Sequence, residues 1–420
     1  MVQRIDLITL RHGSPVHQFA HRKEAERMPE QYQDLNVSTR ILLGPGPSNV
    51  HPRVLRSMAT PLIGHLDPDF LKLMAETKDL LKFAFQTENE LSIPISGTGS
   101  AGMEAALCNL IEEGDEVVVA VNGVFGERMC DIVGRCRAKL HRLDAPWGQV
   151  FQPEQIEDVL RGKQVKLVAM VHAETSTGAL QPAAEIGSIC HRYGALFLLD
   201  AVTSLCGMPV EIDGWDVDAC YSGTQKCMSC PPGLSPLTYN ERARETLRNR
   251  KSKVQSWYLD LTMIEKYWGA ERTYHHTAPI SMNYALREAL RLVHEEGLEP
   301  RFARHKLNQQ ALIAGLEAMG LKLLVAEPYR LPSLTTPLVP EGIDEAKVRA
   351  HLLNQYNIEI AGGLGPLKGK IFRIGLMGHS SQRENVLLLL AALETALKAQ
   401  GMRLPVGASV AAAGEVYKNA

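Results

Sequence analysis

The sequence contains no long hydrophobic run, no block of like charge and no internal repeat. No apolar stretch approaches the roughly 20 residues that a membrane-spanning helix needs, so we expect no membrane partner. The formal net charge is only −2 over 420 residues, and so small a charge gives no electrostatic footprint for nucleic acid. Hydrophobic residues at 45% and charged residues at 22% are instead typical of a soluble globular protein.

Cysteine is sparse as well. Eight cysteines scattered along the chain do not have the density of a disulfide framework, so reduced thiols are the better interpretation. Residues 1–40 contain no apolar run long enough for a signal-peptide core, and their acidic residues argue against a transit peptide. We therefore expect a cytoplasmic protein in which residues 1–40 form a loosely held N-terminal extension.

Short β-branched apolar runs alternate with helical stretches from about residue 90. Near-continuous apolar strands separated by helices predict an α/β fold, with a parallel sheet covered on both faces. After about residue 285, long amphipathic helices predict a second, smaller α+β domain. The predicted organisation is an N-terminal extension, a large domain whose first segment reaches the site, a small domain and a C-terminal tail, at residues 1–40, 41–295, 296–400 and 401–420.

A glycine-rich loop, "SGTGSAG", carries Gly97, Gly99 and Gly102 at the spacing G-x-G-x-x-G. This spacing alone is a weak indication of a dinucleotide site. Such a site also needs an acidic residue at the end of the next strand, where this chain has Asn122 and Gly123. Free backbone N–H groups at a helix N-terminus still suit a phosphate. The loop therefore predicts a phosphate site, with a tight strand–helix turn as the alternative.

Asp200 and Lys226 each follow an apolar strand. Asp200 closes the run "ALFLLD", where it could be a helix cap or a surface residue, or could bind a cationic ring nitrogen. Lys226 follows "DACYS" and a tight turn. Most lysines are solvated surface residues, but in a semi-buried pocket the amine pKa falls and the amine becomes nucleophilic toward carbonyls.

Cys227 and Cys230 follow this lysine in the form C-x-x-C, and Cys220 precedes it. The form suits a redox or zinc half-site, but zinc usually takes four nitrogen or sulfur ligands, and no second pair supplies the others. A free cysteine behaves most often as a small buried hydrophobe. We therefore expect these thiols to pack beneath the lysine loop, and we expect no metal site.

Arg373 stands in "FRIGLMGH", a strand-like run of the predicted small domain. A surface arginine is the ordinary interpretation, but an arginine facing an interdomain cleft is well shaped to bind a carboxylate with two hydrogen bonds. The chain thus carries a phosphate loop, an acid for a ring nitrogen, a nucleophilic lysine and a carboxylate-binding arginine, in that order. A pyridoxal phosphate enzyme needs this set of groups.

The sequence also resembles the class V aminotransferases of pyridoxal-phosphate fold type I, most closely the alanine–glyoxylate / serine–pyruvate aminotransferases. The resemblance covers about residues 40–400 and implies a large domain with a mostly parallel seven-stranded sheet, a smaller C-terminal α+β domain, and pyridoxal 5'-phosphate as cofactor. It is carried by the motifs "LLGPGPSNVHPRVL", "SGTGSAGMEAAL", "NGVFGER", "HAETSTGALQP", "LLDAVTSL", "YSGTQKCMSCPPG", "YHHTAP" and "GGLGPLKGKIFRIGLMG".

The resemblance also implies roles for individual residues. Lys226 matches the lysine that forms a Schiff base with the cofactor, and Asp200 matches the acid that pairs with the ring nitrogen. Arg373 matches the substrate-carboxylate arginine, and Gly46 of the "GPGP" loop would line the entrance. The other matches are to residues on the two ring faces (Phe125, Val202), beside the phenolic oxygen (Thr175), around the phosphate (Thr98, Gly99, Ser100, Gln225), and around the phosphate from the neighbouring subunit (Tyr274, Thr277). The last pair implies a homodimer with shared active sites.

The activity that the resemblance implies is transfer of the amino group of alanine or serine to a 2-oxo acid, foremost glyoxylate, which gives glycine. One alternative is another class V enzyme, such as a 2-aminoethylphosphonate or ureidoglycine aminotransferase. A nucleotide- or metal-binding protein is the alternative from a different class. A cysteine desulfurase is disfavoured, because it needs a nucleophilic cysteine in the small domain and no cysteine follows Cys230.

Overall fold

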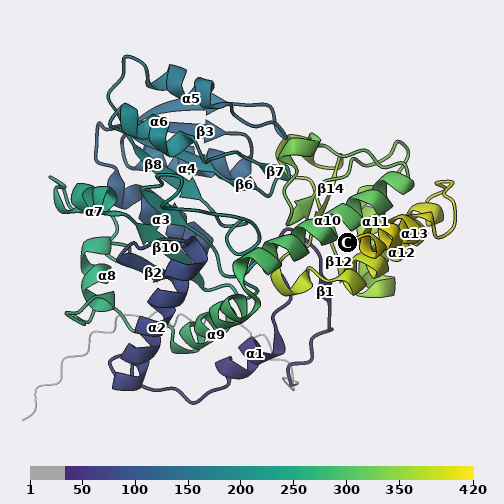
Figure 1. The fold of residues 1–420 in the computed structure, drawn as a ribbon, viewed down its shortest axis with the longest axis horizontal. Coiled ribbons are helices and arrows are strands. Elements are labelled where there is room, and N and C mark those ends of the chain that lie inside the picture. The colour runs from purple at the N-terminus through teal and green to yellow at the C-terminus, as the bar shows by residue number, and fades with distance from the viewer. Residues whose placement is uncertain (1–33) are drawn as a thin grey trace, which may run out of the picture. The chain divides into compact units, whose positions relative to one another are not determined.

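A seven-stranded sheet lies in one part of the unit formed by Arg40–Ala420, beside the C-terminal helices α10 (Leu298–Ala318) to α13 (Ala408–Lys418) (Figure 1). The computed structural model describes residues 34–420, so most of the predicted N-terminal extension lies outside the described residues. Strand β10 runs antiparallel between β2 and β9, and the other strands all run in one direction, which confirms the predicted mostly parallel sheet. In spatial order the strands are β2 (Leu91–Ser96), β10 (Leu234–Tyr239), β9 (Ala219–Tyr221), β8 (Leu196–Asp200), β5 (Val165–Val171), β3 (Glu116–Val121) and β4 (Lys139–Asp144).

Alternate side chains of the central strands enter two separate hydrophobic cores. In β3, Val118 and Ala120 pack into one core, whereas Val117 and Val119 pack into the other. Successive side chains of a strand point to opposite faces, so a run buried on both faces must be apolar at every position. This requirement explains why the strands could be recognised as continuous β-branched runs.

Helices cover both faces of the sheet. Residues of α5 and α6 belong to the first core, residues of α3, α4, α7 and α8 belong to the second, and α2 and α9 contribute to both. The helix bounds are α1 (Pro52–Met58), α2 (Pro68–Phe85), α3 (Gly99–Leu110), α4 (Val124–Arg135), α5 (Pro153–Leu160), α6 (Ile186–Arg192), α7 (Glu241–Arg248), α8 (Leu261–Trp268) and α9 (Ile280–Glu296).

The chain beyond α9 builds a third hydrophobic core from helices and short strands. Strand β14 is central in a three-stranded antiparallel sheet of order β11-β14-β13, and Leu43 from the beginning of the unit packs into the same core. The elements here are α10 (Leu298–Ala318), α11 (Glu345–Tyr356), α12 (Arg383–Ala399), α13 (Ala408–Lys418), β11 (Leu334–Thr335), β13 (Ala361–Gly362) and β14 (Phe372–Gly375), and β12 (Ile358–Glu359) pairs with β1 (Ile41–Leu42). Between β5 and α6, the short strands β6 (Ala173–Glu174) and β7 (Ala179–Leu180) pair with each other.

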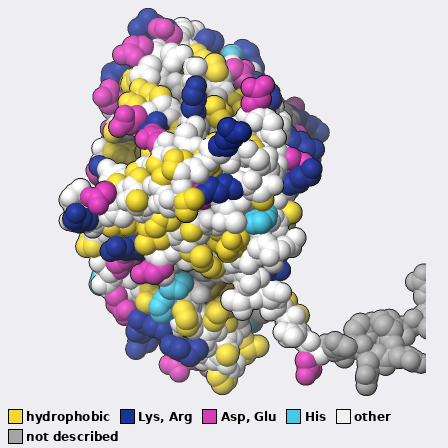
Figure 2. Space-filling model, turned by 90° about the vertical axis from the view of Figure 1, so that its right-hand side faces the viewer, with side chains coloured by type: hydrophobic (Ala, Val, Ile, Leu, Met, Phe, Trp, Pro, Cys, Tyr) yellow, Lys and Arg dark blue, Asp and Glu magenta, His cyan; other side chains and the backbone are white. Residues whose placement is uncertain are grey.

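The predicted C-terminal tail, residues 401–420, contains helix α13, which packs against α10 and buries Ser409 and Ala413. The predicted domain boundaries after residues 295 and 400 remain predictions. Among the described residues, no helix is long and apolar enough to cross a membrane. On the side of the C-terminal helices, acidic, basic and hydrophobic side chains are interspersed (Figure 2).

We expect Gly102→Ala to destabilise the fold, because Gly102 lets α3 approach β10 closely. A Cβ atom at this position would lie 1.9 Å from Ser235 Oγ and 2.9 Å from Ser235 Cβ. Overpacking of this kind costs about 1–3 kcal/mol. The midpoint of urea denaturation measures the change.

Gly134→Ala is the matched control, because a Cβ atom at this exposed position of α4 would meet no atom within 4 Å. Alanine has the higher helix propensity by about 1 kcal/mol, so this variant should be as stable as the parent or slightly more so. Equal midpoints for the two variants would contradict the packing argument.

Candidate active site

The loops that follow β2, β3, β5, β8 and β9 gather at one edge of the sheet, because these strands run in the same direction. Sheets of this kind bind ligands at the carboxyl ends of their strands. The predicted residues of the large domain stand in these loops or at the ends of the adjoining elements: Thr98, Gly99 and Ser100 after β2, Phe125 after β3, Thr175 after β5, Asp200 and Val202 at the end of β8, and Gln225 and Lys226 after β9.

Asp200 is a buried carboxylate that accepts hydrogen bonds from neutral groups. Its Oδ1 accepts from the Val202 N–H at 2.8 Å, and its Oδ2 accepts from the Tyr221 hydroxyl at 2.6 Å. Burial raises the Asp200 pKa to about 6, although both hydrogen bonds oppose the shift. No described side chain forms an ion pair with Asp200, so its environment suits a cationic ligand atom.

Lys226 is buried at the same edge. Its ammonium group donates a hydrogen bond to the Pro45 carbonyl, and its side chain is 8% exposed. Burial lowers the Lys226 pKa to about 8; the charge of Asp200 opposes this shift, and the charge of Arg373 adds to it. The amine is therefore partly neutral near neutral pH, the state in which it is a nucleophile or a base.

Gly46, which was predicted to line the entrance of the site, lies against this lysine. Its φ of +105° lies in the region that favours glycine, and a Cβ atom here would be 2.6 Å from Lys226 Cδ and 2.8 Å from Nζ. The loop 44–47 can therefore close over the lysine only because it has no side chain at Gly46.

The glycine loop presents unpaired hydrogen-bonding groups. Helix α3 begins at Gly99, and its N-cap residue, Thr98, makes no side-chain capping bond. The first N–H groups of a helix have no partner within the helix, so they favour an anion. Thr98 and Ser100 are exposed beside them, and the Gln225 Oε1 atom is buried without a hydrogen-bond partner in the described chain.

The glycine loop also contacts the other loops at this edge. A Cβ atom at Gly99 would lie 3.4 Å from Val202 Cγ2 and 3.6 Å from Gly223 Cα, so the three segments touch. Ser100 Oγ accepts a hydrogen bond from Arg128 at 3.0 Å, and the Arg128 guanidinium lies 5.2 Å from the centre of the Phe125 ring. These contacts unite the predicted phosphate and ring-face residues.

Arg373 joins the site from β14 and is buried. Its Nε donates to the Gly362 carbonyl at 2.7 Å, and its Nη1 donates to the Thr175 carbonyl at 3.2 Å. Burial lowers the Arg373 pKa, which the charge of Glu174 opposes. No acidic side chain among residues 34–420 forms an ion pair with Arg373, so its guanidinium suits a carboxylate ligand.

Tyr274 and Thr277 are the predicted residues that the structure leaves apart from this group. Both are exposed, and within the described chain neither makes a hydrogen bond to the other predicted residues. Between them, His276 bonds to Ser96 at 2.7 Å, at the end of β2. Their predicted contribution to a neighbouring subunit remains a prediction.

The three cysteines around Lys226 are packed in the protein interior. Cys220, Cys227 and Cys230 belong to one hydrophobic core, and Cys227 Sγ donates to the Thr203 carbonyl at 3.3 Å. Burial raises the pKa of the Cys227 thiol to about 11 and also raises that of Cys230. The thiolate is the form that binds metal or reacts, so these contacts favour packing over thiol chemistry.

Two residues at this site were missed by the sequence analysis. Tyr221 lies directly opposite Asp200 in the paired strands β8 and β9, so the register of the two strands could have revealed it. Glu174 is fully buried beside Thr175, and burial raises its pKa to about 6. The sequence did offer an indication of it, because Glu174 is the only acidic residue of the motif that follows the buried strand β5.

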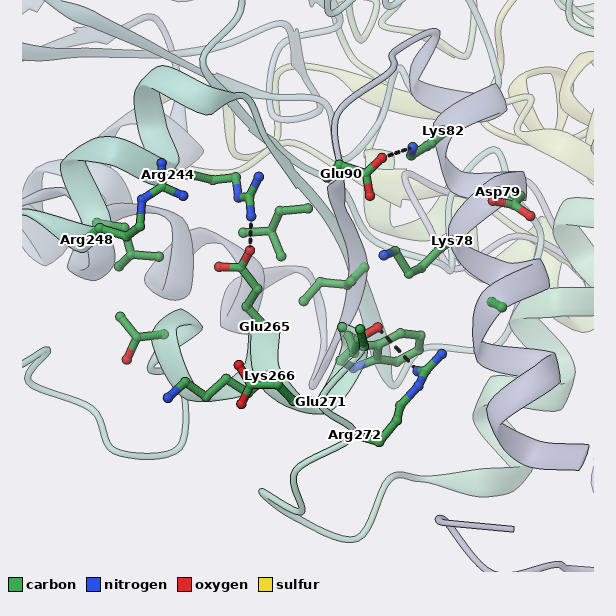
Figure 3. A pocket seen from close by; sticks show the side chains of 18 residues that line it. Lys78, Asp79, Lys82, Glu90, Arg244, Arg248, Glu265, Lys266, Glu271 and Arg272 are labelled. Atoms are coloured by element: carbon green, nitrogen blue, oxygen red, sulfur yellow. Dashed lines mark hydrogen bonds and ion pairs between the residues drawn. The ribbon is translucent and has the colours of Figure 1, made fainter. Parts of the chain in front are cut away.

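A separate pocket of about 810 Å³ lies among α2, α7 and α8 (Figure 3). It contains none of the predicted site residues. Lys82 points to Glu90 at 3.0 Å, and Arg244 pairs with Glu265. Because several of its charged side chains neutralise one another, we place the candidate active site at the sheet edge.

Comparison with known proteins identifies the family of this chain. The family model for the class V aminotransferases matches residues 44–386. The chain is 44% identical over 406 residues to the (S)-ureidoglycine–glyoxylate transaminase of Bacillus subtilis, covering 92% of this chain and 98% of that protein. It is 41% identical over 368 residues to the alanine–glyoxylate aminotransferase of Callithrix jacchus, covering 87% and 89% of the two chains.

Solved structures agree with these matches. The ureidoglycine–glyoxylate aminotransferase of Bacillus subtilis superposes with a TM-score of 0.91 at 45% identity, covering 92% of this chain and 100% of that chain. The alanine–glyoxylate aminotransferase of Nostoc sp. superposes with a TM-score of 0.86 at 50% identity, covering 87% and 97%.

The lowered Lys226 pKa predicts a pH-dependent stability of the cofactor-free protein. A lysine whose pKa falls from 10.5 to about 8 on folding binds its proton more weakly in the folded state, so it destabilises the fold below pH 8. Stability then rises between pH 8 and pH 10.5 as the penalty disappears. Lys226→Met removes the group, so its stability advantage over the parent should shrink by about 2–3 kcal/mol between pH 7 and pH 10.

Urea denaturation of the cofactor-free parent and variant at several pH values measures this difference. Lys347→Met is the control, because the Lys347 side chain is 76% exposed and its removal should give a difference independent of pH. If the stability advantage of Lys226→Met over the parent does not change with pH, the folded protein does not lower the Lys226 pKa, and the prediction is wrong.

Proposed function

The chain belongs to the class V aminotransferases, and on that premise we propose that it transfers the amino group of alanine or serine to glyoxylate, giving glycine. The observation that carries the proposal is the buried Lys226 amine, placed with Asp200 and Arg373 at the strand ends. Glyoxylate is named in the activities of the Bacillus subtilis and Callithrix jacchus relatives, whereas the amino donors in those names differ.

The site fits pyridoxal 5'-phosphate, the cofactor of this family. The Gln225 Oε1 atom has no hydrogen-bond partner in the described chain, and no side chain caps the N-terminus of α3. A buried acid with only neutral donors, Asp200, suits a protonated ring nitrogen. When bound, the cofactor supplies an electrophilic carbonyl carbon and a ring that accepts electrons from the substrate Cα.

The residues that would hold the cofactor come from every loop of the site. We assign the phosphate to Thr98, Gly99, Ser100 and Gln225, the two ring faces to Phe125 and Val202, the phenolic oxygen to Thr175, and the ring nitrogen to Asp200. Lys226 would attach to the carbonyl carbon through Nζ. These assignments rest on the shared position of the residues and on the resemblance of their motifs.

Lys226 would also move the proton that the reaction requires. Its amine, with a pKa of about 8, can take a proton from the substrate Cα at Nζ and return it during the second half of the reaction. The Pro45 carbonyl, which accepts from Nζ, orients the amine. The absence of a side chain at Gly46 lets the loop lie against the lysine.

Arg373 would bind the α-carboxylate of the donor and of the 2-oxo acid. Two backbone carbonyls hold its guanidinium, so the arginine is oriented before the substrate arrives. A fixed carboxylate aligns the Cα–H bond toward Lys226, which is a positioning effect on the rate.

We further propose a homodimer in which Tyr274 of the partner subunit and Thr277 of the partner subunit complete the phosphate site. The exposure of both residues in one subunit supports this proposal. We also propose a cytoplasmic location, supported by the unpaired state of all eight cysteines.

Ureidoglycine is the second candidate donor. The TM-score of 0.91 and 100% coverage of the Bacillus subtilis enzyme favour it. Both candidates share the acceptor and the α-carboxylate, so Arg373 serves both. Only the donor side chain distinguishes them.

Donor screening tests the proposed function. We expect glycine to form from glyoxylate with alanine or serine as donor, and none with 2-aminoethylphosphonate, because its acidic group lies one carbon further from the amino-bearing carbon than an α-carboxylate does, so binding to Arg373 would misplace the reacting carbon. Glycine measured by chromatography is the readout, and Lys226→Ala should abolish turnover. Selective use of (S)-ureidoglycine, generated in situ, would favour the second candidate. No glycine from any donor would contradict both.

Arg373→Lys should weaken substrate binding, because lysine cannot make the two parallel hydrogen bonds of a guanidinium. We expect KM for the amino donor to rise about 10- to 100-fold, with the cofactor still bound, since loss of a charge-assisted bond costs about 1.5–3 kcal/mol. Steady-state kinetics measure KM, and the visible absorbance reports the cofactor. Arg403→Lys, at an exposed position, is the control. An unchanged KM in Arg373→Lys would refute the carboxylate assignment.

A further inference from the structure

Glu174 is a buried carboxylate at the active site to which the proposed function gives no role. It is 0% exposed, and no described cation forms an ion pair with it. Its Oε1 accepts from the Ser176 N–H at 2.9 Å and from Ser176 Oγ at 2.6 Å, and its Oε2 accepts from the Phe125 N–H at 3.2 Å. Burial of a carboxylate is costly unless such donors compensate it, so these contacts need an explanation.

These contacts cap helix α4 from a distant loop. The N-cap residue of α4 is Gly123, which makes no side-chain capping bond. The next two N–H groups instead donate to the loop after β5: Val124 to Ser176 Oγ at 3.1 Å and Phe125 to Glu174. A negative charge at this end also interacts favourably with the helix dipole.

Gly123 is the residue that makes room for this external cap. Its φ of 176° is extended backbone that any residue adopts, so its conformation does not require glycine. A Cβ atom here would lie 2.3 Å from Glu174 Cδ and 2.5 Å from Ser176 Oγ. The close approach of the carboxylate to α4 therefore requires glycine.

The same short segment also contacts Arg373. The Thr175 carbonyl, between the two capping residues, accepts from Arg373 Nη1 at 3.2 Å. Residues 174–176 therefore join the first turn of α4, which carries Phe125, to the arginine of β14. A shift of this segment would move both groups together.

We propose that Glu174 is a positioning residue that holds the Phe125 ring against the cofactor and, through the adjoining Thr175 carbonyl, holds Arg373 toward the substrate. This inference rests on the proposed function of the site. It assigns to Glu174 no contact with the cofactor or the substrate.

Glu174→Gln tests the proposal. The amide keeps one acceptor oxygen but turns an N–H donor toward either Phe125 or Ser176, so at least one hydrogen bond is lost. We expect the cofactor dissociation constant to rise on the order of 10-fold and kcat to fall about 10- to 100-fold, because small misplacements of positioned groups cost that much. We also expect the visible circular dichroism of the bound cofactor to change, since it reports the ring environment.

Glu394→Gln is the matched control. Glu394, in the C-terminal core, is also a buried carboxylate that accepts bonds from a backbone N–H, a serine hydroxyl and a lysine, at 3.0, 3.0 and 2.7 Å. Its replacement should lower thermal stability and leave the cofactor dissociation constant and dichroism unchanged. If Glu174→Gln likewise changes only thermal stability, the proposal is overturned.

A double-mutant cycle with Phe125→Ala tests the route of the effect. If Glu174 acts through Phe125, adding Glu174→Gln to Phe125→Ala should change the cofactor dissociation constant by much less than 10-fold, because coupled residues are not additive. Fully additive effects would overturn the proposal. Should Glu174→Gln fail to fold, Ser176→Ala removes the hydroxyl shared by Glu174 and Val124 and should weaken cofactor binding several-fold; unchanged binding would then overturn it.

These readouts separate the two proposals. Cofactor affinity and dichroism do not depend on which amino donor the enzyme uses. A parent protein that binds the cofactor but makes no glycine would contradict the proposed function. The cofactor affinity and dichroism of Glu174→Gln would still test the positioning role of Glu174.

Discussion

Burial of ionisable groups at one edge of the sheet is the constraint on which the rest of this structure depends. Desolvation disfavours the charged form of every group there, so it raises the pKa values of Asp200 and Glu174 to about 6 and lowers that of Lys226 to about 8. The carboxyl pKa values therefore move up toward neutral pH, and the lysine pKa moves down toward it. A base whose pKa lies near the operating pH, such as the Lys226 amine, is well matched to proton transfer. The protein must supply enough stability elsewhere to keep them out of water.

The fold supplies this stability with two hydrophobic cores, one on each face of the sheet. Strands that are apolar at every position hold their ends rigidly, so the loops that follow can be short and can meet. Where the loops meet, glycine provides the room: Gly46 against Lys226, Gly99 near Val202, and Gly123 against Glu174. The geometry of the candidate site therefore depends on positions without a side chain as well as on its functional side chains.

The sequence was sufficient for groups whose signal is local. Asp200 ends the apolar strand β8 and Lys226 stands in the loop after β9, and the mostly parallel sheet follows from the central strands being apolar at nearly every position. Contacts between segments far apart in the chain carry no such signal. Tyr221 reaches Asp200 only through strand register, and Glu174 caps α4 across 49 positions of sequence. The antiparallel direction of β10 likewise depends on which strands become its neighbours, and the residues of β10 alone do not indicate these neighbours.

The proposed phosphate site links cofactor binding to assembly. Within one subunit, the Gln225 Oε1 atom is buried, whereas Thr98, Ser100, Tyr274 and Thr277 are exposed. If Tyr274 of the partner subunit and Thr277 of the partner subunit complete the site, the cofactor contacts both chains at once. A ligand that binds the dimer more tightly than the monomer must stabilise the dimer by the same factor. A partner residue at the phosphate thus makes cofactor affinity depend on subunit concentration, and the monomer should be the weaker binder even though it contains Lys226, Asp200 and Arg373.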